Sequence, residues 1–412
     1  MKKNVFYIPR ELETAIELYR NSPEIIAIIG TRQCGKTTLM QHIMQGIKGK
    51  RVVFLDFEDR DELNLFTSDI KSFAKLHVEG KDFLFIDEFQ YAAEGGKQLK
   101  YLYDHFPIKI IITGSSATEL SIQSIRHLVG RIFVFTLHPF SFYEFLSYKE
   151  PNLAELIRTE PALSSVIIER TQPYYQEYLI YGGYPRVVLA DSFQEKEVVL
   201  KNIFQTYLLK EIRQILNYRH DLKLEKLIRA LAFQVSGICN YNELSGLTGL
   251  KYRELLEALD ILTNTFVVSP SRPYFTNKRL ELVKSPKFYF IDNGFRNSAV
   301  KNFRPPAERS DRGALHENFI AAELLKKDID LRYWRTKSKA EVDFIIDQGN
   351  QLVPLEVKTQ LGGPRVSRSF RSFIDKYHPA QAIIASNTFF ANDTLGETTL
   401  SFRPHWQVIT DL

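Results

Sequence analysis

The chain has 412 residues, of which 44% are hydrophobic and 25% are charged, a composition that excludes a disordered chain and allows several compact units. Lys and Arg number 54 against 49 Asp and Glu, so the net charge of +5 permits nucleic-acid partners without requiring them. The only cysteines are Cys34 and Cys239, which excludes a disulfide framework and favours a reducing compartment. No apolar run has the length of a signal peptide or a membrane span, so we expect a cytoplasmic protein without a membrane partner.

The first motif follows an apolar run at residues 25–29, which predicts a buried strand. It reads Gly30-Thr31-Arg32-Gln33-Cys34-Gly35-Lys36-Thr37, with Thr38 next. This G-x-x-x-x-G-K-T spacing between a strand and a helix predicts a loop that binds the phosphates of ATP. Gly30 and Gly35 allow positive φ and close approach of backbone N–H groups, and Lys36 would reach the β and γ oxygens. Thr37 would place its hydroxyl on Mg²⁺.

A second buried strand is predicted at residues 81–86, and it ends at Asp87 and Glu88. Buried parallel strands read as continuous apolar runs, and ligands gather at their carboxyl ends. We therefore expect Asp87 to hold Mg²⁺ through water, and Glu88 to orient and deprotonate the attacking water. Residues 51–56 supply a further strand.

A third buried strand is predicted at residues 108–112, followed by Thr113-Gly114-Ser115-Ser116. If this strand lies between the other two, it sets small hydroxyls beside the γ-phosphate, and Ser115 or a neighbouring hydroxyl would sense that phosphate. A plain turn after a buried strand is the other interpretation.

From about residue 140 to residue 217 the apolar spacing becomes helical, with one break at Tyr181-Gly182-Gly183-Tyr184-Pro185-Arg186. We interpret this region as a helical lid. Arg131 and Arg186 are candidates for an arginine finger, which offsets the charge on a transferring phosphoryl group. A solvated or ion-paired surface arginine is the other interpretation of each.

Residues 222–268 read as helix, short helix, turn and helix, with strands at 265–268 and 287–291. This order resembles a winged helix-turn-helix unit. Its third helix would offer Lys251, Tyr252 and Arg253 to DNA at its amino end, and residues 271–279 would form a basic, aromatic wing. Winged units also serve as packing modules, so both roles stay open.

Two alternating runs near the carboxyl end, residues 341–347 and 351–358, predict a β-hairpin. If the turn centres between residues 348 and 349, Asp343 lies opposite Pro354 and diagonal to Glu356, on one face. Both carboxylates would then share Mg²⁺ or Mn²⁺, with Lys358 on the same face. Such a metal site suits phosphodiester hydrolysis, whereas a solvated, charged hairpin face is the other interpretation.

The predicted metal site has further candidate partners. An amphipathic helix begins near residue 313, and its Glu317 would supply a third carboxylate. Cationic residues interleaved with aromatic ones flank the hairpin and suit a nucleic-acid groove. They are Arg332, Trp334, Arg335, Lys337 and Lys339 on one side, and Arg365, Arg368, Phe370, Arg371 and Phe373 on the other.

These motifs together resemble, nearly end to end, those of the prokaryotic AAA+ ATPases that carry a carboxyl-terminal domain of unknown function related to PD-(D/E)xK nucleases. Five segments are similar to the blocks of the ATPase half: the phosphate loop, Ile86-Asp87-Glu88-Phe89-Gln90, Thr113-Gly114-Ser115-Ser116, Gly130-Arg131 and Tyr181-Gly182-Gly183-Tyr184-Pro185-Arg186. Glu317, Glu341-Val342-Asp343-Phe344 and Leu355-Glu356-Val357-Lys358 are similar to those of the nuclease-like half.

The resemblance implies an α/β protein in four parts. They are a parallel-sheet ATPase core at 1–138, a helical lid at 139–221, a winged-helix-like unit at 222–291 and a restriction-endonuclease-like α/β domain at 292–412. Two functions stay open. In the first, ATP turnover is coupled to a nuclease-like site that acts on nucleic acid, DNA above all. In the second, the chain is an ATP-controlled switch that binds DNA or a protein partner without cleavage. The resemblance also raises the odds of a homo-oligomer.

Overall fold

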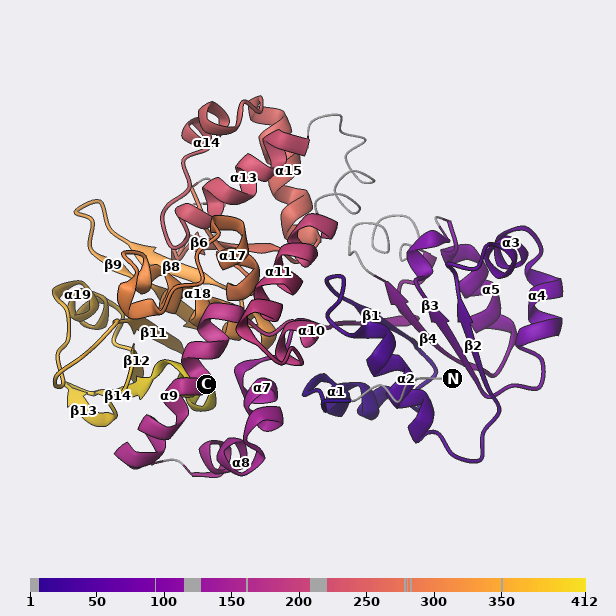
Figure 1. The fold of residues 1–412 in the computed structure, drawn as a ribbon, viewed down its shortest axis with the longest axis horizontal. Helices are drawn as coiled ribbons and strands as arrows, with labels where there is room; N and C mark the ends of the chain where they lie inside the picture. The colour runs from indigo at the N-terminus through magenta and orange to yellow at the C-terminus, as the bar shows by residue number, and fades with distance from the viewer. Residues whose placement is uncertain are drawn as a thin grey trace. The chain divides into compact units, whose positions relative to one another are not determined.

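The structure is a computed structural model that describes residues 7–92, 94–114, 127–160, 162–207, 221–277, 279, 281, 284–349 and 351–412. It divides into two compact units. The N-terminal unit comprises Met1–Pro139 with Asn264–Phe266, and the C-terminal unit comprises Phe140–Thr263 with Val267–Leu412. Figure 1 shows the fold of each unit and labels most of its elements.

The N-terminal unit contains a parallel sheet with strand order β2-β3-β4-β1-β5 among its described residues. The strands are β1 Ile25–Ile29, β2 Val52–Asp56, β3 Phe83–Asp87, β4 Lys109–Gly114 and β5 Ile132–Thr136. The helices are α1 Leu12–Tyr19, α2 Lys36–Gly46, α3 Arg60–Ser68, α4 Ile70–His77 and α5 Gly96–His105. The predicted strands at 25–29, 51–56, 81–86 and 108–112 are confirmed, and β4 does lie between β1 and β3.

The burial of each strand follows from its place in the sheet. The central strands β1, β3 and β4 are buried along their whole length, whereas the edge strands β2 and β5 are mostly half-buried. Central parallel strands are covered on both faces, which explains their unbroken apolar sequence.

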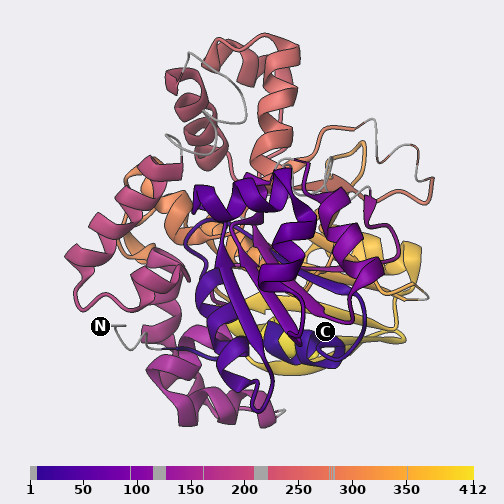
Figure 2. The same ribbon diagram turned by 90° about the vertical axis from the view of Figure 1, so that its right-hand side faces the viewer.

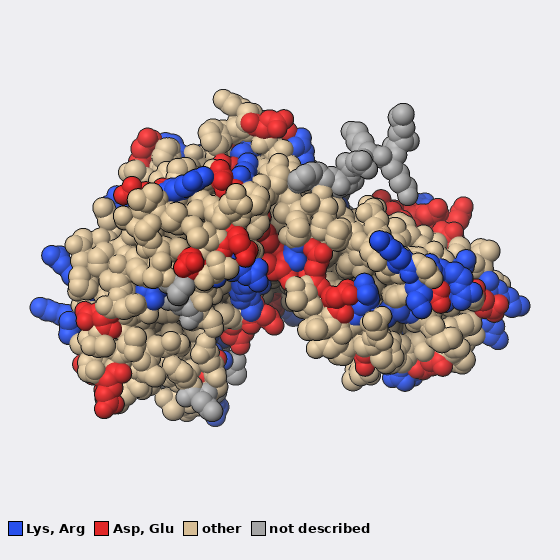
Figure 3. Space-filling view, turned by 90° about the horizontal axis from the view of Figure 1, so that it is seen from below, with Lys and Arg blue, Asp and Glu red and all other residues tan. Residues whose placement is uncertain are grey.

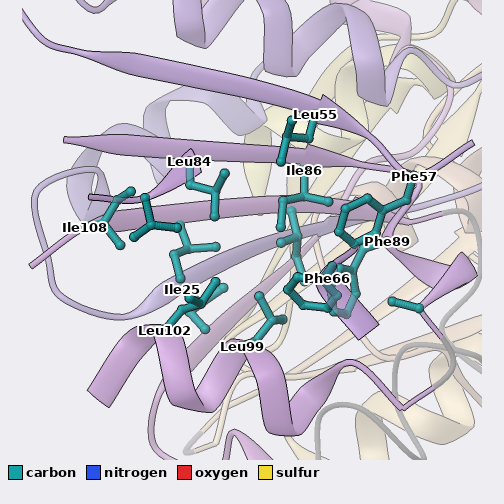
Figure 4. Packing of buried hydrophobic residues seen from close by; sticks show 14 of the residues in the cluster. Ile25, Leu55, Phe57, Phe66, Leu84, Ile86, Phe89, Leu99, Leu102 and Ile108 are labelled. Atoms are coloured by element: carbon teal, nitrogen blue, oxygen red, sulfur yellow. The ribbon is translucent and has the colours of Figure 1, made fainter. Parts of the chain in front are cut away.

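Helices cover both faces of this sheet, as the two views in Figures 1 and 2 show. Alternate residues of β1 enter two separate cores, with Ile25 and Ala27 on one face and Ile26 and Ile28 on the other. Figure 4 shows Leu99 and Leu102 of α5 facing the strands on the first face. The segments that follow β1, β3 and β4 leave the sheet at one edge, because these strands are parallel neighbours.

The C-terminal unit begins with helices and ends with strands. Its helices are α7 Phe142–Lys149, α8 Pro151–Thr159, α9 Ser165–Tyr181, α10 Pro185–Val188, α11 Phe193–Tyr207, α13 Asp221–Phe233, α14 Tyr241–Thr248, α15 Tyr252–Asn264, α17 Asn293–Val300, α18 Arg312–Lys326 and α19 Arg368–Tyr377. The helical region predicted from residue 140 is present as α7 to α11. The predicted order of helix, short helix, turn and helix is present as α13, α14, a left-handed Gly249 and α15.

The strands of this unit form two sheets in its described residues, ordered β7-β6-β8-β9 and β10-β11-β12-β14-β13. Their bounds are β6 Val268–Pro273, β7 Lys287–Phe290, β8 Arg332–Arg335, β9 Glu341–Val342, β10 Phe344–Asp347, β11 Leu352–Val357, β12 Gln381–Ser386, β13 Ala391–Leu395 and β14 Thr398–Pro404. The second sheet is mixed, because β10 and β13 run antiparallel to their neighbours. Helix α19 packs Phe370 and Phe373 into the core against this region.

The predicted hairpin is present, but its predicted register is wrong by two residues. Ile345 pairs with Pro354, because the turn is closed by the Gln348 N–H bond to the Gln351 carbonyl and Gly349 inside it has a φ of +84°. A shift of two keeps every side chain on its face. Continued by one residue, the observed register sets Asp343 opposite Glu356 rather than diagonal to it.

The first run of the hairpin is also divided between the two sheets. Val342 pairs with Trp334 in β8, whereas Phe344 pairs with Leu355 in β11. Asp343 lies at this break, where its carboxylate accepts the Val357 N–H at 2.8 Å. The predicted boundaries within residues 139–412 stay a prediction. Across the described ranges, no helix combines the length and the hydropathy that crossing a bilayer needs.

Candidate functional site

The loop between β1 and α2 has the backbone of a phosphate-binding loop. Gly35 caps α2 with a φ of +99°, and Gln33 also has a positive φ of +61°. A Cβ atom on Gly30 would lie 2.0 Å from the carbonyl oxygen of Leu137. Glycine is therefore required at both ends of the loop: at position 30 because a side chain would clash with Leu137, and at position 35 because of its positive φ.

The interior of this loop contains polar groups that suit a bound phosphate. Lys36 is 6% exposed, and its ammonium donates to the carbonyl oxygens of Gly30 and Thr31, both at 2.9 Å. The buried hydroxyl of Thr31 has no hydrogen-bond partner among the described residues. Since buried polar groups are normally satisfied, the unpaired hydroxyl and the folded-back ammonium fit a nucleotide phosphate. Thr37 and Thr38, in the first turn of α2, and Arg32 are half-buried.

Arg10 supports the loop, and the sequence analysis missed this role. Its buried guanidinium donates to the Cys34 carbonyl at 2.9 Å and to the His138 carbonyl at 2.5 Å. It therefore ties the phosphate loop to the segment that follows β5. A lone arginine before the first strand carries no pattern that would have revealed this contact.

The acids after β3 lie at the carboxyl edge of the sheet. Asp87 is 3% exposed, and it accepts hydrogen bonds from the Thr113 hydroxyl and, at 3.1 Å, from the Glu88 N–H. The N–H of Glu88 also lies 3.3 Å from the Thr113 hydroxyl. Thr113 thus connects the end of β4 with the acids of β3. The carboxylate of Asp87 suits water-mediated Mg²⁺ binding at the edge where the phosphate loop leaves β1.

The position of the Glu88 side chain is restrained by its backbone conformation and by a hydrogen bond from a neighbouring side chain. Its φ of +52° is uncommon for a residue with a side chain, and its carboxylate accepts a hydrogen bond from the Gln90 side-chain amide. Gln90 is a residue that the sequence analysis assigned no function. Strained backbone of this kind gathers at functional positions, so Glu88 fits the role of orienting a water.

The structure does not place Ser115 or Arg131 in the nucleotide site. Ser115, with Ser116, lies outside the described residues, so its sensing role stays a prediction. Arg131 directly precedes β5. Its carbonyl accepts the N–H of Ile25 at the amino end of β1, and its side chain pairs with Asp104 at 3.0 Å. The phosphate loop follows the opposite end of β1, about 16 Å away for five residues. This placement does not support a finger role within the same chain, and a role toward another copy stays a prediction.

Arg186 is the second residue of the short helix α10 in the C-terminal unit. Its guanidinium pairs with Glu195 at 2.5 Å, and its side chain is 58% exposed. The glycines before it pack closely against Asp292 and Phe140, so the bend has a structural reason of its own. A finger role for Arg186 stays a prediction.

The structure brings together Asp343, Glu356 and Lys358 of the predicted nuclease-like site. Glu356 is 4% exposed, and its Oε1 accepts from Lys358 Nζ at 2.7 Å and from the Ser367 hydroxyl at 2.8 Å. Burial and, next, the Glu317 carboxylate raise the pKa of Asp343 to about 8. The main cause is burial, which disfavours the charged form, and the neighbouring carboxylates add to it while Lys287 opposes it.

The sequence analysis missed the buried cation at this acidic centre, which is Lys287 of β7. Lys287 is 1% exposed, and its Nζ lies 2.7 Å from Glu341 Oε1 and 3.2 Å from Glu317 Oε1. Burial alone would lower the pKa of Lys287, but the nearby carboxylates of Glu317, Asp343 and Glu341 outweigh it and raise that pKa. One feature of the sequence could have revealed this role: Lys287 begins an aromatic run that reads as a buried strand. A lysine buried in such a strand is normally paired with a carboxylate.

The centre does not fit a divalent cation as it stands. In the parts of the chain that are described, no group of three or more His, Cys, Asp or Glu side chains is arranged to hold a metal ion. Glu317 binds Lys287, Glu356 binds Lys358 and Ser367, and Asp343 binds the backbone. Metal binding by Glu317, Asp343 and Glu356 therefore stays a prediction that these contacts do not favour.

The predicted nucleic-acid surfaces are present only in part. The aromatic members Trp334, Phe370 and Phe373 lie in the core, so the expectation that they face a groove is wrong. Arg332 and Arg335 pair with Asp347 and Glu341. The remaining cationic residues are exposed, namely Lys337, Lys339, Arg365, Arg368 and Arg371, as are Lys251, Tyr252 and Arg253 at the start of α15. In Figure 3, basic and acidic side chains are interspersed on the face shown.

The fold and the loop geometry define a P-loop nucleotide-binding domain in the N-terminal unit, and comparison with known families agrees. Residues 22–146 match the model of an AAA domain family. Residues 172–306 and 312–398 match two domains of unknown function, DUF8612 and DUF4143. The N-terminal match supports an AAA-type P-loop ATPase domain, and the other two assign no activity.

Several curated proteins are similar over most of the chain. An uncharacterized protein of Haemophilus influenzae is 27% identical, covering 83% of this chain and 84% of its own length. An uncharacterized protein of Methanocaldococcus jannaschii is 25% identical, covering 90% and 82%.

Matches among solved structures include a Walker-type ATPase of Pyrococcus abyssi, with 17% identity, a TM-score of 0.44 and coverage of 71% of this chain and 96% of that one. A RuvB protein of Thermotoga maritima has 16% identity, a TM-score of 0.31 and coverage of 67% and 95%. Similarity at this level carries no argument about function.

Proposed function

We propose that the N-terminal unit binds ATP with Mg²⁺ and hydrolyses it. The single observation that carries this proposal is the convergence of Lys36, Asp87 and Glu88 at the carboxyl edge of one parallel sheet, with Thr113 linking the two acids. Phosphoryl transfer requires positioning and charge compensation more than covalent chemistry, and these residues supply both.

Each residue has a task that follows from its position. Lys36 would exchange its two carbonyl acceptors for phosphate oxygens. Thr37 and Asp87 would hold Mg²⁺, which, when bound, offsets negative charge on the β- and γ-phosphates. Glu88, oriented by Gln90, would accept a proton from the attacking water.

We further propose that the C-terminal unit binds nucleic acid, DNA above all, without cleaving it. Exposed cations support this role, and none of Lys337, Lys339, Arg365, Arg368 or Arg371 belongs to an ion pair found within the described residues. Polyanion binding is dominated by such phosphate contacts. The buried lysine in the acidic centre argues against metal-dependent cleavage.

A second candidate is cleavage by the same centre. It is favoured by the register of β10 and β11, which would set Asp343 opposite Glu356 if continued by one residue, and by Lys358, whose ammonium lies 2.7 Å from Glu356. A switch that acts on a protein partner, or through a homo-oligomer, would need the same ATPase.

One experiment separates these candidates. The full chain, Lys36→Ala and Asp343→Ala are incubated with ATP, Mg²⁺ or Mn²⁺ and single- and double-stranded DNA and RNA, with the exposed Lys48→Ala as the matched control. We expect ATP turnover to disappear only in Lys36→Ala, and nucleic acid to be bound intact by the wild type. Cleavage that is lost in Asp343→Ala would establish the second candidate. An ATPase that neither binds nor responds to any nucleic acid would contradict the binding role.

A further inference from the structure

The acidic centre of the C-terminal unit contains a cation that belongs to the protein. Lys287 projects from β7 into a group of carboxylates contributed by α18 and β9. Its Nζ lies 2.7 Å from Glu341 Oε1 and 3.2 Å from Glu317 Oε1, and its side chain is 2% exposed. The Tyr289 hydroxyl donates to the same Glu317 oxygen at 2.5 Å. Glu317 is therefore fixed by two donors from one strand.

Lys287 cannot easily leave this position. Its ammonium also lies 5.3 Å from the centre of the Tyr333 ring, and the strand that carries it is buried along its length. Removing one partner of a buried ion pair leaves the charge of the other partner buried and uncompensated, which is strongly destabilising. The contacts thus make Lys287 a fixed part of the centre.

The ammonium and a divalent cation compete for the same oxygens. Glu317 has Lys287 within 3.2 Å, and Asp343 lies near enough to both for electrostatic interaction with each. A Mg²⁺ ion requires oxygen ligands at about 2.0 to 2.1 Å in near-octahedral geometry. An ion placed between Glu317 and Asp343 would meet the positive charge of Lys287 at close range, in surroundings that screen charge weakly.

We propose that Lys287 is the resident cation of this centre, in the place where a divalent metal would lie between Glu317 and Asp343. The wild-type centre accordingly binds no Mg²⁺ or Mn²⁺, and removal of the ammonium creates a divalent-cation site there. This inference extends the proposed non-cleaving role of the unit. Its test measures metal binding directly, so its failure is distinguishable from a failure of ATP hydrolysis or nucleic-acid binding.

The test is Mn²⁺ binding to the full chain without nucleotide, measured by electron paramagnetic resonance of the unbound ion. The proteins compared are the wild type, Asp343→Asn, Lys287→Met, Lys287→Met with Asp343→Asn, and the exposed Lys284→Met as the matched control. We expect Lys287→Met to bind about one Mn²⁺ per chain more than the wild type does. The second substitution should remove that site, and Lys284→Met should behave as the wild type does.

Two results would overturn the proposal. One is a wild-type Mn²⁺ site that Asp343→Asn removes, which requires no lysine variant to fold. The other is a folded Lys287→Met protein, shown by its tryptophan fluorescence, that binds no more Mn²⁺ than the wild type. If Lys287→Met does not fold, Lys287→Gln, which can still donate to Glu317, takes its place with the same expectation.

Discussion

Glu88 and Gln90 form the smallest functional arrangement in the N-terminal unit. The backbone of Glu88 is left-handed, its N–H donates to Asp87, and its carboxylate accepts from Gln90. A carboxylate restrained in this way is positioned before substrate arrives. Gln90 is therefore a positioning residue that acts through Glu88.

Replacement of Gln90 by alanine should slow hydrolysis without preventing ATP binding. A hydrogen bond to a charged group contributes about 1.5 to 3 kcal/mol, so loss of this positioning should lower kcat by about 10- to 100-fold. The KM for ATP should change by less than about twofold, because Gln90 is expected to act on the water and not on the phosphates. Steady-state phosphate release measures both, with Gln98→Ala on α5 as the control. A rise in KM with unchanged kcat would contradict the assignment.

The sequence predicts the residues of the phosphate loop because their spacing alone defines the chemistry. It does not predict the partners that tertiary structure supplies. Thr113 reaches Asp87 only because β4 lies beside β3, and Lys287 reaches Glu317 from 30 positions away. Arg10 is likewise joined to His138 across the unit. Contacts between distant segments leave no periodic pattern, so these roles could not be read from the residues.

The elements α9 and α17 interlock through glycines. A Cβ atom on Gly294 would lie 2.0 Å from the Tyr181 carbonyl oxygen, and one on Gly182 would lie 2.2 Å from Asp292. The buried Asp292 carboxylate accepts the N–H groups of Gly183 and Phe295, at 2.7 and 2.8 Å. The Gly-Gly bend that resembles a family motif is therefore needed for helix packing.

Gly294→Ala should destabilise the C-terminal unit because a backbone carbonyl cannot yield to the added methyl group. Overpacking of this kind costs about 1 to 3 kcal/mol. The matched control is Gly313→Ala in α18, where the nearest atom to an added Cβ is 3.6 Å away and a helix is favoured by alanine. Urea unfolding followed by tryptophan fluorescence measures both. Equal stability of the two variants would show that the contact between Gly294 and the Tyr181 carbonyl can accommodate a methyl group.

At the scale of elements, the register of the hairpin formed by β10 and β11 could not be predicted from the sequence. The alternating runs identify β10 and β11, but the turn that sets their register depends on one glycine conformation. Two turns that differ by two residues leave the same residues on the same face. The sequence therefore indicates which side chains share a face, and only the structure shows which pair is opposite.

The molecule as a whole combines two units with separate cores, and both tryptophans, Trp334 and Trp406, are buried in the C-terminal unit. This unit also buries two stacked histidines, His316 and His405, whose ring centres are 4.3 Å apart. Burial, and next Arg312, lower the pKa of His316 to about 4. Burial, and next His316, lower the pKa of His405 well below its usual range.

These histidines should make the C-terminal unit sensitive to acid. A histidine with a depressed pKa binds protons more tightly when unfolded, so its contribution to stability is present above about pH 6.5 and is lost as the pH falls toward 4. For His316 alone, the loss between pH 7 and pH 5 is about 2 kcal/mol. Urea unfolding by tryptophan fluorescence at both pH values should show a smaller loss in His316→Gln. Parallel pH dependence in wild type and variant would contradict this account.

At the scale of the whole molecule, the sequence predicts an α/β ATPase core well, because each buried parallel strand is a continuous apolar run. The aromatic residues near the hairpin were misassigned to a surface because aromatic rings suit both a core and a stacking platform. The sequence around Phe370 contains no feature that distinguishes a core position from an exposed stacking position, and the structure buries this residue. Charge placement is more informative, since Arg365, Arg368 and Arg371 are exposed as expected.

The most direct test of the central claim is phosphate release from ATP by the wild type and by Glu88→Gln, together with the Kd of each for ATP. The account predicts that Glu88→Gln binds ATP as the wild type does and releases phosphate at least about 100-fold more slowly, since it keeps the shape of Glu88 and loses the base. Glu79→Gln, an exposed residue before β3, should hydrolyse ATP at the wild-type rate. Wild-type turnover by Glu88→Gln would contradict the account.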